Sequence, residues 1–129
     1  MEYEIKEGLY YTEGHEWLKV EADTGIVGIS HYASVEMGDV AYIELPKPGK
    51  VLKGGKMCEI ESVKAVSDIY APVSGEITEV NSELTDSPEL INEDPYNAWI
   101  AKIKIKDTAE LENLMSAQEY TAYIKSLKE

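Results

Sequence analysis

The chain has 129 residues, 43% of them hydrophobic, and a formal net charge of −13. This length predicts one domain, spanning residues 1–129. The acidic balance excludes nucleic acid as a ligand, because phosphate binding needs a cationic surface, and it disfavours anionic membrane surfaces. Basic patches on partner proteins suit such a charge, although a plain role in solubility is the alternative.

A single cysteine, Cys58, rules out an internal disulfide and fits a reducing compartment. Because it lies in an expected strand, we predict a small buried side chain rather than a reactive thiol. The opening residues MEYEIKEG lack the apolar run of a secretory signal and the arginines of a mitochondrial transit peptide, and no stretch is long enough to span a membrane. We therefore expect a cytoplasmic protein, with a processed organellar protein as the alternative.

Short apolar or alternating runs, separated by glycine, proline and other turn residues, predict many short strands. The expected strands are 10–20 with a kink at Gly14, 26–29, 39–45, 50–53, 57–62, 66–71, 76–80 and 99–105. Their number and spacing favour a sandwich or a barrel. We expect residues 1–9 to be loosely ordered, and residues 81–98 to form an irregular stretch with one helical turn near 82–84.

Helices are expected in two places. Ser30 is a suitable N-cap for a short helical turn that ends at Gly38. Two pairs after the last strand have the spacing of capping boxes, namely Asp107 with Glu110 and Ser116 with Glu119. They predict two short helices within 107–128 that pack on the sheets, since neither is long enough to be stable alone in water.

The segment MCEIESVKAVSDIYAP, residues 57–72, does not follow one simple pattern. Its apolar residues recur every three positions, which fits a helical face, but its β-forming composition and final proline favour two strands around Lys64. Such a hairpin has none of the usual turn residues. Because local rules fail most often at functional sites, Lys64 is a candidate functional residue, with an ordinary surface lysine as the alternative.

The stretch Glu61-Ser62-Val63-Lys64-Ala65, followed by Ser67-Asp68 and Ala71-Pro72-Val73-Ser74-Gly75, resembles the lipoylation motif of the glycine cleavage system H protein family. Other segments resemble landmarks of that family in the same order: His15-Glu16-Trp17, Gly38-Asp39-Val40, Glu44-Leu45-Pro46, Gly75-Glu76, Glu79-Val80-Asn81, Leu90-Ile91-Asn92 and Pro95-Tyr96. The resemblance extends from about Tyr10 to Tyr123.

The resemblance implies a mainly β fold, the flattened two-sheet barrel-sandwich of lipoyl and biotinyl domains. Its core would span about 10–106 and a helical C-terminal segment 107–128. It also implies the hairpin, with Lys64 at the tip carrying lipoic acid through an amide. Glu16 and Asp68 would contact the arm or its cationic adduct. Carboxylates near the tip, Glu61 and Asp68 with Glu59, would help a modifying enzyme to select this lysine.

The family function is that of a monomeric, non-catalytic carrier that shuttles the methylamine group of glycine. The implied partners are a pyridoxal-phosphate-dependent glycine decarboxylase, a folate-dependent aminomethyltransferase, dihydrolipoamide dehydrogenase and a lipoate-attaching enzyme. An H-like lipoyl protein of lipoate relay or sulfur metabolism is the alternative. An independent enzyme is disfavoured because no catalytic constellation is visible, and biotinylation because methionines do not flank Lys64. The two histidines lack the companions of a metal site.

The sequence departs from the family pattern in three places. Gly14 replaces the small hydroxyl residue that commonly precedes His-Glu-Trp. Tyr32 stands where the family often has histidine, and the stretch between Tyr96 and Trp99 is shorter than usual. The first two departures bear on how the arm and its adduct would be held, and leave the lipoylation motif intact.

Overall fold

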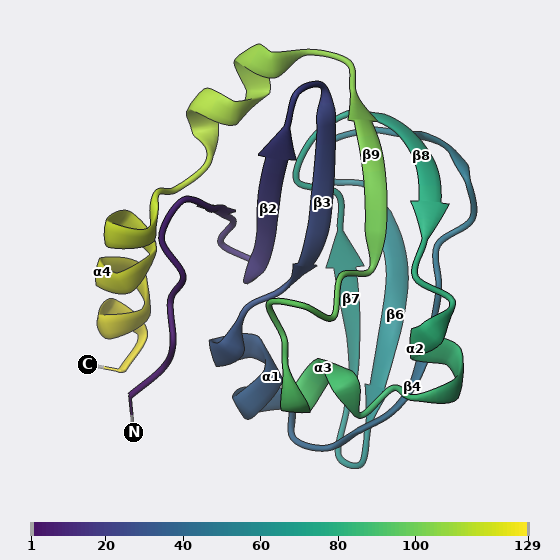
Figure 1. Cartoon of the computed structure of the whole chain (residues 1–129). Helices are drawn as coiled ribbons and strands as arrows, with labels where there is room; N and C mark the ends of the chain where they lie inside the picture. Colours follow the sequence, from purple (N-terminus) through teal and green to yellow (C-terminus); the bar gives the residue numbers. More distant parts are fainter. Residues whose placement is uncertain (1, 129) are drawn as a thin grey trace.

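The computed structural model describes residues 2–128, which form two antiparallel sheets with short helices at their edges (Figure 1). One sheet has six strands in the order β1-β2-β3-β9-β8-β5, and the other has three in the order β4-β6-β7. The strands are β1 (Tyr10–Tyr11), β2 (Glu16–Glu21), β3 (Thr24–Ile29), β4 (Val40–Glu44), β5 (Gly49–Val51), β6 (Lys56–Ser62), β7 (Val66–Tyr70), β8 (Gly75–Val80) and β9 (Ala101–Ile105). The mainly β, two-sheet prediction is confirmed, and these strands remain open sheets rather than a closed barrel.

The helices are short except for the last one. They are α1 (His31–Met37), α2 (Glu83–Asp86), α3 (Leu90–Glu93), the 3-10 helix η1 (Thr108–Asn113) and α4 (Ala117–Lys128). The predicted cap of α1 is confirmed, because the Ser30 hydroxyl accepts a hydrogen bond from the Ala33 N–H at 3.2 Å. The helix ends at Gly38, whose φ of +79° is a conformation that glycine adopts without strain.

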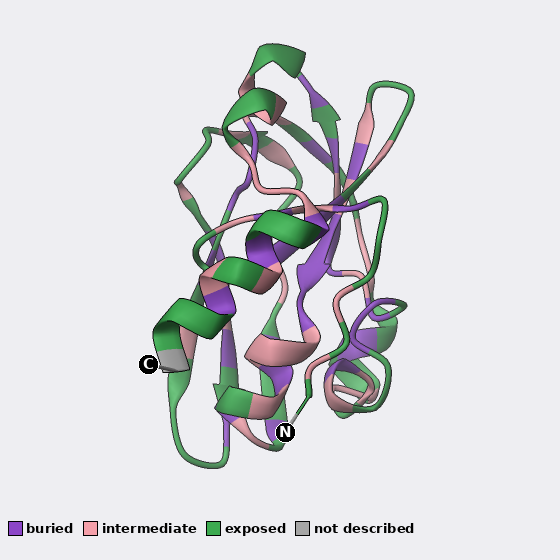
Figure 2. Ribbon diagram, turned by 90° about the vertical axis from the view of Figure 1, so that its left-hand side faces the viewer, coloured by how far each residue is buried: buried purple, intermediate pink, exposed green. Residues whose placement is uncertain are grey.

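Two clusters of buried side chains hold the molecule together. The main cluster is mostly aliphatic and draws on both sheets, with Val27, Ile43, Ile60, Val73 and Ile103 all at 2% exposure or less. The second is aromatic and joins β1 and β2 to α4. In it, the rings of Tyr11 and Tyr120 stack at a centroid distance of 4.5 Å. Buried positions recur every three or four residues along α4, at Ala117, Tyr120 and Ile124, as expected for a helix packed by one face (Figure 2).

The prediction that residues 1–9 are loosely ordered is wrong for the part that the structure describes. The Glu4 N–H donates to Nδ1 of His31 at 2.8 Å, and the Tyr96 hydroxyl donates to the Glu4 carbonyl at 2.6 Å. Leu9 is buried in the aromatic cluster. The segment is polar in composition, but side chains from distant parts of the sequence satisfy its backbone, and no local pattern predicts such contacts.

The predicted strand 10–20 is also wrong, because the chain reverses within it. Strands β1 and β2 pair with each other, with Tyr11 opposite Trp17. The reversal is closed by the His15 N–H, which donates to the Thr12 carbonyl at 3.0 Å. His15 itself has a φ of +72°, which is uncommon for a residue with a side chain. What the sequence suggests as a kink at Gly14 is therefore a tight turn.

The predicted helices near the C-terminus are correct in part. Asp107 caps a 3-10 helix, but Glu110 does not complete a capping box with it. Instead, the Glu110 carboxylate accepts hydrogen bonds from the N–H and the hydroxyl of Ser74, at 2.7 and 3.0 Å. The second box is confirmed, because Ser116 and Glu119 each accept from the backbone N–H of the other, at 3.2 and 2.9 Å. The helix α3 was not predicted within the irregular stretch.

Candidate functional site

Lys64 lies in the turn between β6 and β7, at the tip of this hairpin, and is exposed. The hairpin points downward in Figure 1, with its tip at the bottom of the molecule. The strands pair up to Glu61 and Val66, so the tight turn is made by residues 62–65. The Ser62 N–H donates to the Ala65 carbonyl at 2.8 Å and closes the turn. The predicted hairpin is therefore confirmed, and the helical alternative is wrong.

Ser62 explains how this turn forms without glycine, proline or asparagine. Its side chain is buried, and its hydroxyl oxygen accepts hydrogen bonds from the N–H groups of Lys64 and Ala65 at 3.3 and 3.1 Å. A serine hydroxyl used in this way replaces the backbone partners that a tight turn cannot supply. The tip also has outside support, because the Val63 N–H donates to the Asp39 carbonyl at 3.0 Å.

Apolar side chains flank the lysine on the surface. Val63 is 73% exposed and Val66 is 58% exposed. Valines so open to water gain nothing from burial in the folded chain, and exposed apolar groups beside an exposed amine are suited to contact with another protein. Glu61, directly opposite Val66 in the register, adds an exposed carboxylate next to them.

Glu16, the first residue of β2, is 2% exposed although it carries a carboxylate. The carboxylate accepts hydrogen bonds from the hydroxyl of Thr12 and from the Tyr70 N–H, the latter at 3.2 Å. Burial raises the pKa of Glu16 above its ordinary value, and these hydrogen bonds oppose part of the rise. A Cβ at Gly14 would lie 3.0 Å from both carboxylate oxygens, so glycine leaves this carboxylate more room than a larger residue would.

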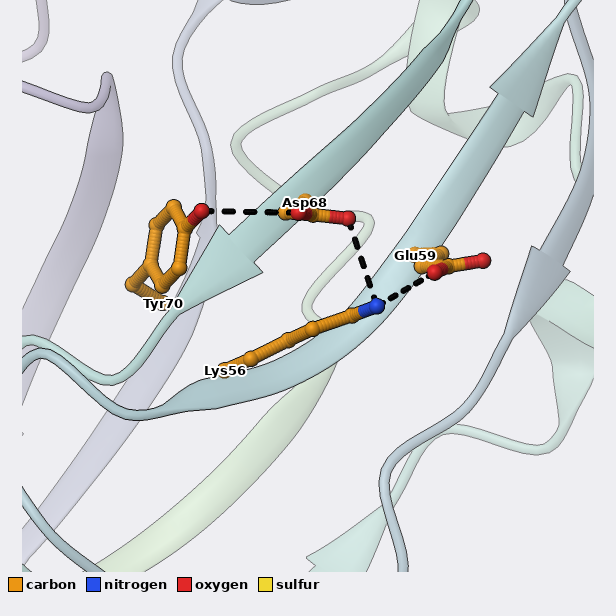
Figure 3. A network of polar contacts seen from close by, with 4 residues as sticks. All are labelled: Lys56, Glu59, Asp68 and Tyr70. Carbon is orange, nitrogen blue, oxygen red and sulfur yellow. Dashed lines mark hydrogen bonds and ion pairs between the residues drawn. The ribbon is translucent and has the colours of Figure 1, made fainter.

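Asp68 belongs to a network of charged side chains on the outer face of the hairpin (Figure 3). The Lys56 ammonium lies 3.4 Å from Asp68 and also forms an ion pair with Glu59. The Tyr70 hydroxyl donates to the other oxygen of Asp68 at 3.4 Å. The pKa of Lys56 is raised, first by its hydrogen bond to Glu59 and then by the proximity of Asp68. The three charged side chains of this network, Lys56, Glu59 and Asp68, together carry one net negative charge.

Tyr70 connects the two carboxylates that the sequence suggests as arm contacts. Its backbone N–H binds Glu16 and its hydroxyl binds Asp68, so the two acids come from different sheets but meet at one residue. Asp68 is four residues from Lys64, which is at most about 13 Å of chain at roughly 3.3 Å per residue. Glu61 also lies on the outer face, nearer the tip, and belongs to the surroundings of Lys64 rather than to this pair.

A cleft of about 440 Å³ opens beside Glu16, at the end of the hairpin away from Lys64. It is lined by residues of the β1–β2 turn, the base of the hairpin, and the end of η1 with the two residues after it, among them Thr12, Glu16, Lys53, Tyr70, Pro72 and Met115. A pocket with a buried carboxylate and neighbouring hydrogen-bond donors is suited to a small polar or cationic group.

Several residues of this site were missed in the sequence. The sequence holds a weak indication of the role of Tyr70, because strand alternation places it two residues after Asp68 and on the same face of the strand. The prediction of a hairpin with no usual turn residue overlooked Ser62, because serine is common in turns and its hydroxyl can accept from nearby backbone N–H groups. Cys58 is as predicted: it is 2% exposed, and burial raises the pKa of its thiol to about 12.

Within residues 2–128, no helix is long and apolar enough to cross a membrane. In the same part of the chain, no group of three or more His, Cys, Asp or Glu side chains is placed to hold a metal ion.

Residues 9–127 match the family model described as glycine cleavage H-protein. This chain belongs to the glycine cleavage H-protein family. It is 64% identical to a probable glycine cleavage system H protein of Pyrococcus furiosus, an alignment that covers 98% of this chain and 96% of the relative. It is 48% identical to the glycine cleavage system H protein of a Thermoanaerobacter species, with 94% and 97% covered.

The fold is shared with a solved member of the family. The crystal structure of a glycine cleavage system H protein from Mycobacterium marinum superposes with a TM-score of 0.83 at 33% sequence identity, covering 94% of this chain and 99% of that one. The family assignment made from the motif around Lys64 is thus confirmed over nearly the whole chain.

Proposed function

We propose that this protein is a lipoyl carrier of glycine cleavage, with lipoic acid joined through an amide to Nζ of Lys64. The observation that carries the proposal is an exposed lysine on a hydrogen-bonded hairpin tip in a member of this family. The residues fit the group: the amine is open to solvent, and the turn beneath it is held by Ser62 and Asp39. Bound there, the group supplies a disulfide that accepts a reactive unit and is reduced.

The chain itself supplies presentation rather than catalysis. Amide formation at Lys64 removes the ammonium charge from the tip, while the surrounding carboxylates remain. Glu59, Glu61 and Asp68 mark this lysine for a lipoate-attaching enzyme with a basic surface. Val63 and Val66 offer apolar contact to the enzymes that the tip enters.

Glu16 and Asp68 are proposed to hold a cationic amine brought to the cleft. A cation close to the Glu16 carboxylate favours its ionised form and so offsets the pKa rise caused by burial. At Asp68 the same cation competes with the Lys56 ammonium. In this way the protein carries the methylamine group of glycine between a pyridoxal-phosphate-dependent decarboxylase, a folate-dependent aminomethyltransferase and dihydrolipoamide dehydrogenase. We propose a cytoplasmic monomer.

The function is tested by glycine–bicarbonate exchange with a glycine decarboxylase and the lipoylated protein. We expect Lys64→Ala to abolish exchange, because no other residue of the turn 62–65 carries a side-chain amine. Lys104→Ala, which removes an exposed strand lysine from β9, is the matched control and retains exchange. Exchange that persists in Lys64→Ala contradicts the proposal. Lipoylation of the wild type without any exchange identifies the H-like carrier of lipoate relay or sulfur metabolism instead.

A further inference from the structure

The side chain of Asn92, in α3, holds the backbone on both sides of Asp39. The Val40 N–H donates to Oδ1 of Asn92 at 2.8 Å, and Nδ2 of Asn92 donates to the Gly38 carbonyl at 2.9 Å. Nδ2 also lies 3.3 Å from the Ser34 hydroxyl. The Asn92 amide thus uses both its acceptor and its donors within residues 34–40. In the opposite orientation, Nδ2 would face the Val40 N–H and Oδ1 would face the Gly38 carbonyl, and both hydrogen bonds would be lost.

This loop is the support on which the hairpin tip rests. The Asp39 carbonyl accepts the Val63 N–H at 3.0 Å. A Cβ at Gly38 would lie 3.4 Å from Cε of Lys64, so the lysine side chain passes directly over that glycine. Gly38 combines a φ of +79° with a ψ of −164°, a conformation that is open almost only to glycine.

The tip has no comparable support elsewhere among residues 2–128. The hydrogen bonds of Ser62 join the two arms of the hairpin to each other, so they shape the turn without fixing where it points. Ser62, at the start of the turn, pairs with Val40 of β4. For residues 63–65, the bond from the Val63 N–H to the Asp39 carbonyl is the backbone hydrogen bond that joins them to described residues outside the hairpin. The orientation of Lys64 therefore depends on the position of the Asp39 carbonyl.

We propose that Asn92 is a positioning residue for Lys64. It holds the Gly38–Val40 backbone so that the Asp39 carbonyl and the Gly38 surface present the lysine in one orientation. This inference rests on the proposed function, in which Lys64 is the residue that a lipoate-attaching enzyme acylates. Attack by an amine on an activated carboxyl depends on alignment, so a loosened tip slows the chemical step more than the docking of the carrier.

The test compares Asn92→Ala and Asn92→Asp with Asn81→Ala. Asn81 is the matched control, because its amide also bridges two backbone groups, Trp99 O at 2.9 Å and Glu83 N at 3.3 Å, in a loop that does not touch the tip. Asn92→Asp keeps the size of the side chain and the acceptor for Val40 but loses the donor to Gly38, so it serves if the alanine variant folds poorly. The first measurement is hydrogen exchange of the Val63 amide in the unmodified protein, relative to that of Ile60. The second is steady-state lipoyl attachment, corrected for the folded fraction.

We expect both Asn92 variants to speed exchange at Val63 and to lower kcat for attachment roughly ten-fold, with KM for the carrier changed less than about two-fold. Asn81→Ala changes neither. Unchanged exchange at Val63, or an equal loss of kcat in Asn81→Ala, overturns the positioning role and leaves a general effect on the fold. If wild-type protein accepts no lipoyl group on Lys64, the proposed function fails, while the Val63 exchange still decides whether Asn92 orients the tip.

Discussion

At the scale of single residues, the hairpin tip depends on one hydroxyl. Ser62 is buried and bonds the N–H groups of Lys64 and Ala65, which have no strand partner. Its neighbours Val63 and Lys64 are exposed instead, and within the described chain their side chains make no hydrogen bonds. The serine in this motif therefore has a structural reason that is separate from the chemistry of the lysine.

Replacing Ser62 tests this role. Ser62→Ala leaves two turn N–H groups without their acceptor, which costs about 1–2 kcal/mol in the free energy of unfolding and speeds amide exchange at Lys64 and Ala65. Ser67→Ala is the control, since the Ser67 hydroxyl on β7 makes no hydrogen bond with the described residues. Urea denaturation and hydrogen exchange measure the two effects. Equal behaviour of the two variants would show that the turn does not rely on Ser62.

At the scale of elements, α4 is fastened to the body of the molecule by a buried polar chain. The Tyr120 hydroxyl lies 2.7 Å from the hydroxyl of Ser30, the N-cap of α1, and 2.8 Å from Nδ1 of His15. Burial lowers the pKa of His15 below its ordinary value of 6.5, and the carboxylate of Glu36 opposes part of this change. Folding thus weakens the binding of a proton to His15.

This pKa shift predicts a dependence of stability on pH. Because the folded protein binds the His15 proton less tightly than the unfolded chain, stability is full above about pH 6.5 and falls as the pH drops through 6.5 towards the lower folded pKa. His15→Asn keeps a residue that tolerates the positive φ but cannot titrate, so it flattens this part of the profile. Urea midpoints of both proteins at pH 7.5, 6.5 and 5.5 make the comparison. Profiles of equal slope would contradict it.

The elements that sequence patterns predicted are those with local causes. Alternation and turn residues locate most strands, and the serine cap locates α1. The reversal between β1 and β2 was missed because His15 adopts a left-handed conformation that is atypical of its residue type. The acceptor role of Glu110 was missed because its partner, Ser74, is distant in the sequence. Local spacing matched a capping box, and tertiary contacts overrode it.

The residues of the candidate site also fall into those that the sequence predicts and those that only tertiary packing brings together. A motif and a family resemblance point to Lys64, and the hairpin follows from them. The meeting of Glu16 and Asp68 at Tyr70 depends on how two sheets pack, and so does the hold of Asn92 on the loop beneath the tip. No spacing in the sequence encodes these contacts, because their partners lie on different elements.

At the scale of the whole molecule, negative charge is in large excess. The chain has 25 acidic residues against 12 lysines, and four ion pairs join described side chains. The carboxylates outside these pairs repel one another, and at low ionic strength this repulsion acts over the full width of a small domain. Folding brings these charges closer together, so their repulsion lowers the stability of the folded protein.

Salt should accordingly stabilise this protein. Raising NaCl from about 0.01 M to 0.15 M shortens the screening length from about 30 Å to about 8 Å, so the melting temperature rises by several degrees, roughly the shift produced by 1 kcal/mol in a chain of this size. Calorimetry at fixed pH measures the change. A melting temperature that falls with salt over this range would mean that attractive surface pairs outweigh the net repulsion.

We propose that Lys64 is the one lysine among 12 that carries the lipoyl group. This assignment is tested most directly by incubating the unmodified protein with a lipoate-attaching enzyme, ATP and lipoate, then measuring the intact mass and mapping the modified peptide. We expect one added lipoyl group, located on Lys64, and none in Lys64→Arg. An unchanged mass with a folded protein and an active enzyme, or a group on another lysine, would show that Lys64 is not the lipoylation site.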